Sequence, residues 1–333
     1  MIFTDLTRWT VAVAAASLVA TQTGCLDAEE RALAELQSRA EEGHTNAQFE
    51  LAEHYANAAT GEGLGGEAIR WFTTAAEQGH PKAQRSLATR YANGDGVVED
   101  DAKAVTWYRK AAEQGDTLAM SNLGAMFANG EGVTEDDAKA HHWFKKAAEK
   151  GEAAAQFNLG VMYSSGAGVE LDPPLAMKWY TLAAEQGHPS AQANLGVMFA
   201  RGEGVEADVS RAVHFYRLAA EQGDPTAQTN LGAMFAAGEG VPQDDAEAIR
   251  WFNLAAAQGF PRAQFNLGVM YSSSDSVRTN YILAHMWSNI ANANGQSDAR
   301  DTLAMLEERM TKQQISEAQQ RARQWWDTQQ YVN

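Results

Sequence analysis

The stretch that decides the fold runs from Asp116 to Gly151 and reads DTLAMSNLGAMFANGEGVTEDDAKAHHWFKKAAEKG. In its first half, Ala119, Leu123 and Phe127 stand at positions i, i+4 and i+8, which places them on one face of a helix. The sequence Gly130-Glu131-Gly132 then favours a turn, because glycine adopts positive φ angles without steric cost. The stretch therefore predicts a helix that ends at a glycine turn.

The second half of the stretch predicts another helix. The acids Glu135-Asp136-Asp137 supply an N-cap and complement the positive end of the helix dipole. We expect Ala140, Trp143 and Ala147 to form the buried stripe of this helix, and Gly151 to end it. The whole stretch is thus a helix-turn-helix unit.

The unit recurs at a constant interval of 36 residues. A leucine series runs at this interval from Leu51 to Leu303, and a glycine series runs from Gly43 to Gly295. A third series is aromatic and consists of Trp71, Trp107, Trp143, Trp179, Phe215, Trp251 and Trp287. A fixed period of this size indicates stacked repeats that bury their apolar faces against one another. The sequence therefore predicts an all-α solenoid of about seven helix-turn-helix repeats.

The registers also divide the chain. We expect an export signal in residues 1–25, an N-terminal helical cap in 26–43, seven repeats in 44–295 and C-terminal capping helices in 296–333. Thr311 and Gln314 have the spacing of a capping box at the start of the last helix. The seven repeats are expected at 44–79, 80–115, 116–151, 152–187, 188–223, 224–259 and 260–295.

Cys25 is the single cysteine, and it follows an apolar run from Trp9 to Ala20. This run has the length of a signal-peptide core and is too short to span a bilayer. The sequence Thr23-Gly24-Cys25 resembles the end of a bacterial lipobox, although Gln22 departs from its usual aliphatic residue. We expect export with lipidation of Cys25. Ordinary secretory cleavage near Ala20 and an uncleaved leader with an unmodified thiol are the alternatives.

The charge balance limits the partners. The formal net charge is −17, and no basic patch is visible, so nucleic acid is not expected as a partner. A membrane is expected to be involved only through the lipid anchor at Cys25. A basic protein or peptide is the partner that fits this charge. The sequence does not indicate an oligomeric state.

The repeat motif resembles a known family. Its clearest copy is Ala191-Gln192-Ala193-Asn194-Leu195-Gly196-Val197-Met198-Phe199, followed by Gly202-Glu203-Gly204-Val205. This pattern resembles the Sel-one-like repeat family, which is related to tetratricopeptide arrays. The resemblance covers residues 44 to 295. It implies a right-handed α/α superhelix that serves as an adaptor for protein complexes, often in bacterial envelopes or signalling pathways.

A ladder of asparagines and methionines is the candidate binding site. Each asparagine is followed four residues later by a methionine, so each pair lies on one side of a first helix. Asparagine can donate to and accept from a peptide backbone, and methionine adapts to varied side chains. In the alternative interpretation, the asparagines bond a neighbouring helix and the methionines fill the core. The pairs are Asn122 and Met126, Asn158 and Met162, Asn194 and Met198, Asn230 and Met234, and Asn266 and Met270.

The other polar residues do not indicate catalysis. His44, His80 and His188 recur beside the helix-ending glycines, so we interpret them as parts of the repeat. No nucleophile, metal-ligand or phosphate-binding motif is found, and we expect no enzyme activity, metal or cofactor. The sequence thus favours a non-enzymatic envelope scaffold that binds a protein segment on the concave face, around residues 116 to 271. An enzyme acting on cell-wall material and a regulator of envelope signalling are the alternatives.

Overall fold

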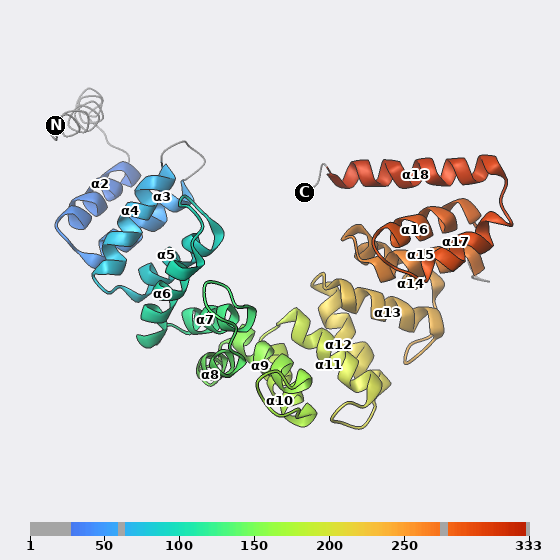
Figure 1. The fold of residues 1–333 in the computed structure, drawn as a ribbon, viewed down its shortest axis with the longest axis horizontal. Helices are drawn as coiled ribbons and strands as arrows, with labels where there is room; N and C mark the ends of the chain where they lie inside the picture. Colours follow the sequence, from blue (N-terminus) through green and yellow to red (C-terminus); the bar gives the residue numbers. More distant parts are fainter. Residues whose placement is uncertain (1–27, 59–63, 274–278, 331–333) are drawn as a thin grey trace. The chain divides into compact units, whose positions relative to one another are not determined.

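A computed structural model describes residues 28–58, 64–273 and 279–330 (Figure 1). Within these ranges it contains seventeen helices and no strand, which confirms the all-α solenoid predicted from the 36-residue period. The first helices of the seven repeats are α3 (Thr45–Asn57), α5 (Pro81–Asn93), α7 (Thr117–Asn129), α9 (Ala153–Ser165), α11 (Pro189–Arg201), α13 (Pro225–Ala237) and α15 (Pro261–Ser273). The second helices are α4 (Leu64–Glu77), α6 (Asp101–Glu113), α8 (Asp137–Ala148), α10 (Pro173–Glu185), α12 (Val209–Glu221), α14 (Asp245–Ala257) and α16 (Tyr281–Ala293).

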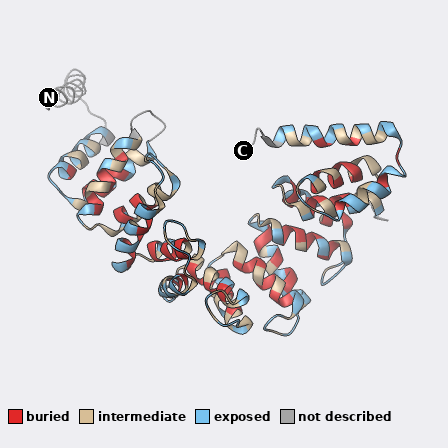
Figure 2. Ribbon diagram, in the orientation of Figure 1, coloured by how far each residue is buried: buried red, intermediate tan, exposed pale blue. Residues whose placement is uncertain are grey.

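The chain forms two compact units, residues 1–143 and residues 144–333. The boundary falls within α8, the second helix of the third repeat. Each unit has its own buried residues between its paired helices (Figure 2). Each unit is therefore a short helical stack with a core of its own.

Aspartates begin the second helices, as the acidic turns predict. The carboxylate of Asp208 accepts a hydrogen bond from the backbone N–H of Arg211 at 2.9 Å, and thereby satisfies one of the free donors at the start of α12. The same side-chain cap recurs every 36 residues. The aspartates that make it are Asp100, Asp136, Asp172, Asp208 and Asp244.

The glycine pair of each turn has two separate roles, which the fifth repeat shows. Gly202 ends α11 in the left-handed conformation, with a φ of 70°. Gly204 also has a positive φ, and a Cβ placed on it would lie 2.8 Å from the carbonyl carbon of Pro173 in the preceding second helix. The first glycine therefore ends the helix, and the second lets neighbouring repeats approach closely.

The buried face of the first helices is the predicted one. Ala119, Leu123 and Phe127 are 0, 0 and 5% exposed. The stripe of the second helix needs a correction, because Phe144 is 3% exposed while Trp143 is only half-buried. Ala140, Phe144 and Ala147 at i, i+4 and i+7 form the central line of the buried face. Trp143 lies on its flank in this repeat, whereas Trp71, Trp251 and Trp287 are buried, so the aromatic series belongs to the core in some repeats and to its edge in others.

A small residue in the first helix receives this second aromatic residue. In the fifth repeat, a Cβ placed on Gly196 would lie 2.5 Å from the ring of Tyr216. Gly160 faces Tyr180 in the same way in the fourth repeat. The Leu-Gly pair of the repeat motif is therefore explained by helix packing, since no side chain fits between the glycine and the ring.

A ladder of buried amides, which we call the glutamine ladder, ties successive repeats together. Gln192 donates through Nε2 to the carbonyl oxygen of Ala184 at 3.2 Å, and its Oε1 accepts from Nε2 of Gln222 at 2.7 Å. It thus links the end of one repeat's second helix to the end of the next. The residues that act in this way are Gln48, Gln84, Gln156, Gln192, Gln228 and Gln264. The third repeat has Met120 and Lys150 at the two positions.

Helices also cover both ends of the repeats. The N-terminal helix is α2 (Ala28–Glu41), and the C-terminal helices are α17 (Ala299–Glu307) and α18 (Lys312–Gln330). The predicted capping box is present, because the backbone N–H of Gln314 donates to Oγ1 of Thr311 and that of Thr311 donates to Oε1 of Gln314. Among the described residues, no helix combines the length and the apolar character that a membrane crossing requires.

Candidate functional site

The methionines of the predicted ladder lie in the core. Met126, Met162, Met198, Met234 and Met270 are 3, 5, 4, 7 and 8% exposed, respectively. Side chains this deeply buried offer almost no surface to a partner. The structure therefore supports core packing for the methionine half of the ladder.

The asparagines of the ladder lie nearer to the surface, and three of them bond a neighbouring helix. Asn230 forms a hydrogen bond with the hydroxyl of Tyr216, which comes from the second helix of the preceding repeat. Asn122 does the same with Tyr108, and Asn194 with Tyr180. Burial raises the pKa of all three tyrosine hydroxyls, so they stay protonated at physiological pH.

Asn158 and Asn266 differ from the other three. The aromatic residue at the equivalent position of the preceding repeat is Phe144 or Phe252, which has no hydroxyl group. No side-chain hydrogen bond involves Asn158 or Asn266 in the described part of the chain, and both are half-buried. These two amides are thus open to solvent or to a ligand, and whether any of the five asparagines contacts a partner stays a prediction.

The first unit has a hollow of about 280 Å³ between α3 and α5. It is lined by Ser86, at the ladder position of the second repeat, and by two bases and two acids. The bases are Arg85 and Arg90, and the acids are Glu53 and Asp95. The charges of this hollow therefore cancel.

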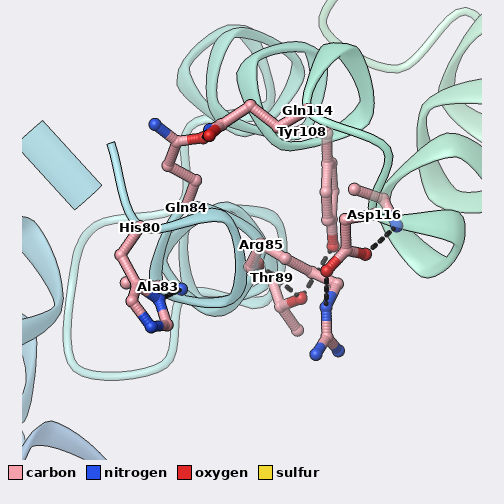
Figure 3. A network of polar contacts seen from close by, with 9 residues as sticks. His80, Ala83, Gln84, Arg85, Thr89, Tyr108, Gln114 and Asp116 are labelled. Atoms are coloured by element: carbon pink, nitrogen blue, oxygen red, sulfur yellow. Dashed lines mark hydrogen bonds and ion pairs between the residues drawn. The ribbon is translucent and has the colours of Figure 1, made fainter. Parts of the chain in front are cut away.

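Figure 3 shows how one of these arginines is held. Arg85 reaches Asp116, with its Nε 3.2 Å from Oδ2, and the two side chains are 27 and 12% exposed. Oδ1 of the same aspartate accepts from the backbone N–H of Ala119 at 2.8 Å and so caps α7. Beside this pair, the hydroxyl groups of Thr89 and Tyr108 lie 2.9 Å apart (Figure 3). Asp116 thus fixes both a helix start and the arginine.

The second unit has a hollow of about 320 Å³ on its first helices, which we call the basic hollow. Arg201 of α11 and Arg262 of α15 line it, together with Tyr216 and with Asn230 of α13. Glu203 is 3.3 Å from the guanidinium of Arg201, but both side chains are at least half exposed. An exposed pair of this kind is weak and can be displaced.

Arg262 has no carboxylate partner among the residues that the structure describes. Burial raises the pKa of Tyr216 to about 12, against the opposing effects of Arg201, Asn230 and Arg262. The tyrosine hydroxyl therefore remains a hydrogen-bond donor at any physiological pH. The basic hollow combines two permanent cations with neutral polar groups.

An apolar hollow of about 280 Å³ lies on the next pair of first helices, α13 and α15. Ala233, Ala237 and Val269 line it, with Phe252 below them and Asn266 at its edge. Small side chains surround it, so it can hold a side chain of modest size. We call it the apolar hollow.

The arginines of the basic hollow were not found from the sequence pattern, because neither is periodic. The positions equivalent to Arg201 in other repeats hold Asn93, Asn129, Ser165, Ala237 and Ser273. Those equivalent to Arg262 hold Lys82, Leu118, Ala154, Ser190 and Thr226. Departure from the repeat pattern was the available signal, and it is weak because surface positions vary in any solenoid.

His80 and His188 cap the starts of α5 and α11, whereas His44, at the start of α3, makes no capping hydrogen bond through its side chain. Nδ1 of His188 accepts from the backbone N–H of Ala191 at 3.3 Å, and Nδ1 of His80 accepts from Ala83 at 3.1 Å. Burial lowers the pKa of both rings, which favours the neutral form that can accept. The described ranges contain no cluster of histidine, cysteine and acidic residues able to hold a metal ion, and Cys25 lies outside them.

Comparisons with known proteins agree with this architecture. The model of the Sel1 repeat matches seven consecutive segments, 45–80, 81–116, 117–152, 153–188, 189–224, 225–260 and 261–296. These segments begin one residue later than the repeats expected from the sequence. A search of curated proteins finds no match.

Two solved structures are similar. The first is c5321, a protective antigen of uropathogenic Escherichia coli with an SLR fold, at 35% identity and a TM-score of 0.76. The match covers 87% of this chain and 64% of c5321. The second is a Sel1 repeat protein from Oxalobacter formigenes, at 34% identity and a TM-score of 0.68, covering 74% of this chain and 99% of that one.

Proteins with Sel1 repeats generally serve as scaffolds for protein–protein interaction and are typically non-enzymatic. The seven matched segments extend without a gap from residue 45 to residue 296. With its helix pairs, its glutamine ladder and its close structural relatives, the chain belongs to the Sel1 repeat family.

Proposed function

We propose that this protein is a non-enzymatic scaffold of the bacterial cell envelope that binds a protein segment on the surface of its first helices. The observation that carries the proposal is the position of the three hollows within the repeats; a further hollow lies at the N-terminal end, mostly on α2. The neutral hollow of the first unit, the basic hollow and the apolar hollow all lie mainly on first helices. Residues on this surface vary between repeats, whereas the buried faces follow the 36-residue period.

Binding on this surface uses the asparagines and leaves the methionines mainly in the core, although Met270 borders the apolar hollow. Asn230 lines the basic hollow and Asn266 lines the apolar hollow, so two members of the predicted ladder border open space. An amide there can bond the backbone of an extended segment regardless of its side chains. The hollows then select among segments.

The net charge of −17 favours a partner that carries basic residues elsewhere on its surface. Such long-range attraction raises association rates more than it raises affinity. The apolar leader and Cys25 are what support an encounter in the envelope with the protein tethered by a lipid. Mass spectrometry of the mature protein tests the tether. Acylated Cys25 as the first residue supports it, and an intact Met1 contradicts export.

Photo-crosslinking in the producing cells tests the binding surface. A photoreactive amino acid is placed at Ala233, in the apolar hollow of α13, or at Ala257, which is exposed on the second helix α14. At both sites the photoreactive residue replaces an alanine, and the two helices are neighbours, so the sites differ mainly in which helix carries them. We expect a discrete crosslinked protein from Ala233 and none from Ala257. Crosslinking from Ala257 alone, or equally from both sites, contradicts binding on the first helices.

A further inference from the structure

The basic hollow is unusual for an acidic protein. Arg201, Glu203 and Arg262 together carry a net charge of +1, whereas the chain as a whole carries −17. Arg262 has no acidic partner among the described residues, although the chain has 43 acids. An unpaired cation next to polar donors is a site for an anion.

We propose that the basic hollow binds a carboxylate group of the partner segment, held between the guanidiniums of Arg201 and Arg262. This inference rests on the proposed function and specifies the chemistry of its binding site. Guanidinium groups match carboxylates in geometry, because their planar N–H groups can form paired hydrogen bonds. The hydroxyl of Tyr216 and the amide of Asn230 add neutral polar groups to the same wall.

The charge balance favours a carboxylate over a phosphate. With Glu203 kept beside Arg201, one monoanion neutralises the net charge of +1 that Arg201, Glu203 and Arg262 carry together, while a dianion leaves an excess negative charge. The negative field of the rest of the protein repels a dianion about twice as strongly, since Coulomb energy is proportional to charge. A single carboxylate is therefore the matching group.

The apolar hollow gives the ligand a second feature. Arg262, Asn266 and Val269 stand at i, i+4 and i+7 of α15, so the two hollows follow one another along one face of this helix. Thr226, in the basic hollow, and Ala233 are seven residues apart on α13 in the same way. Seven helical residues span about 10 Å, which is the length of about three residues of extended chain.

The preferred segment is therefore extended and has a carboxylate followed or preceded, about three residues away, by a small apolar side chain. The carboxylate comes from an aspartate or glutamate side chain or from the end of a chain. A segment of this kind within an otherwise basic partner satisfies both the local charge of +1 and the overall charge of −17.

Selection of random peptides on the purified full chain tests the proposal. One library presents peptides fused at both ends, so its only carboxylates are side chains, and a second presents free C-termini. We expect enriched peptides from the first library to contain an acid near a small apolar residue. Enrichment of acid-free peptides from the second library alone assigns the site to a chain end and also supports the proposal.

Variants with matched charge changes show whether the arginines are responsible. We expect Arg262→Gln and Arg201→Gln to weaken binding of an enriched peptide roughly tenfold or more, measured by fluorescence anisotropy. Arg211→Gln on α12 removes the same charge outside the hollow, and we expect it to bind as the parent does. Thermal unfolding of each variant verifies that it folds.

Three results overturn the carboxylate site. They are enrichment of peptides that lack a carboxylate, equal affinity of the parent and Arg262→Gln, and the absence of any enriched peptide. These results leave the proposed function intact if Ala233 still crosslinks to a partner in cells. Loss of that crosslink contradicts the scaffold surface itself, so the two failures can be told apart.

Discussion

The hollow between α3 and α5 and the basic hollow of α11, α13 and α15 both lie on first helices, but Arg85 of the first and Arg262 of the second are in different states. In the first unit, Arg85 is tied to Asp116 and lies among further acids. In the second unit, the position equivalent to Arg85 is Ala193, and Asp224, the equivalent of Asp116, has no arginine beside it. Arg262 comes from another position of the repeat and has no carboxylate partner among the described residues, and Arg201 has only its exposed pair with Glu203.

The comparison shows how one repeat can carry different functions. Caps, turn glycines and the glutamine ladder are the same in both units, so the backbone presents the same surface positions. A few substitutions at those positions decide whether an arginine stabilises the protein or faces a ligand. In this family, surface exceptions to the pattern are thus more informative about binding than the pattern itself.

The largest effect is expected from breaking the pair of Arg85 and Asp116 in the first unit. Asp116→Ala removes the cap of α7 and leaves Arg85 without its carboxylate, which we expect to lower the free energy of unfolding by about 2 kcal/mol. Asp224→Ala is the matched control, because it removes only a cap from α13 and should cost about 1 kcal/mol. Urea denaturation of both variants measures the difference. Equal losses contradict a stabilising role for Arg85.

The periodic part of this molecule could be predicted from the sequence because it is repeated. Ala119, Leu123 and Phe127 were assigned to the core, and acids were assigned to the second-helix caps, since each choice is confirmed by several copies. Trp143 is only half-buried although the tryptophan series is conspicuous, and the residue after it is less easily noticed because that position varies between phenylalanine, tyrosine and, in the last repeat, serine. Because each position occurs in seven copies, an ambiguous residue in one copy does not change the assignment of that position.

The candidate site could be predicted only in part, for the same reason. Asn230 and Asn266 recur and were found, but their surroundings differ by one hydroxyl group, on Tyr216 and absent from Phe252. To predict that difference, one must know which second-helix residue each asparagine contacts, and this comes only from the structure. Arg201 and Arg262 are single substitutions 61 positions apart in the chain, and only the packing of the first helices brings them to one hollow.

The asparagine ladder offers a sharper comparison within the second unit. Asn230→Ala loses the hydrogen bond to the hydroxyl of Tyr216, and we expect it to lower the free energy of unfolding by about 1 kcal/mol. Asn266→Ala removes the same amide next to Phe252 and should change stability by less than about 0.5 kcal/mol. Chemical denaturation compares the two. A larger loss from Asn266→Ala contradicts the assigned partners.

The smallest expected effect concerns the first-helix caps, where each unit uses both aspartate and histidine. The ring of His188 stacks on Phe157 at 4.6 Å, and burial lowers its pKa below the ordinary value of 6.5 despite the opposing charge of Glu152. Because the unfolded chain takes up the proton more readily than the folded one, this histidine stabilises the fold above about pH 6.5. Its contribution is lost as the pH falls from that value through the lowered pKa.

His188→Asp replaces this cap with the residue type found at Asp116 and Asp224. Aspartate side chains ordinarily titrate at about pH 3.9, below this range. We expect the loss of thermal stability between pH 7.5 and pH 5 to be smaller in the variant than in the parent, since one source of proton uptake on unfolding is gone. Melting temperatures are measured at both pH values for the parent and the variant. Because the other titrating groups are the same in the two proteins, their effects cancel in the comparison. An equal or larger loss in the variant would show that the neutral His188 cap does not contribute to stability, and would leave burial alone to explain the position of its ring.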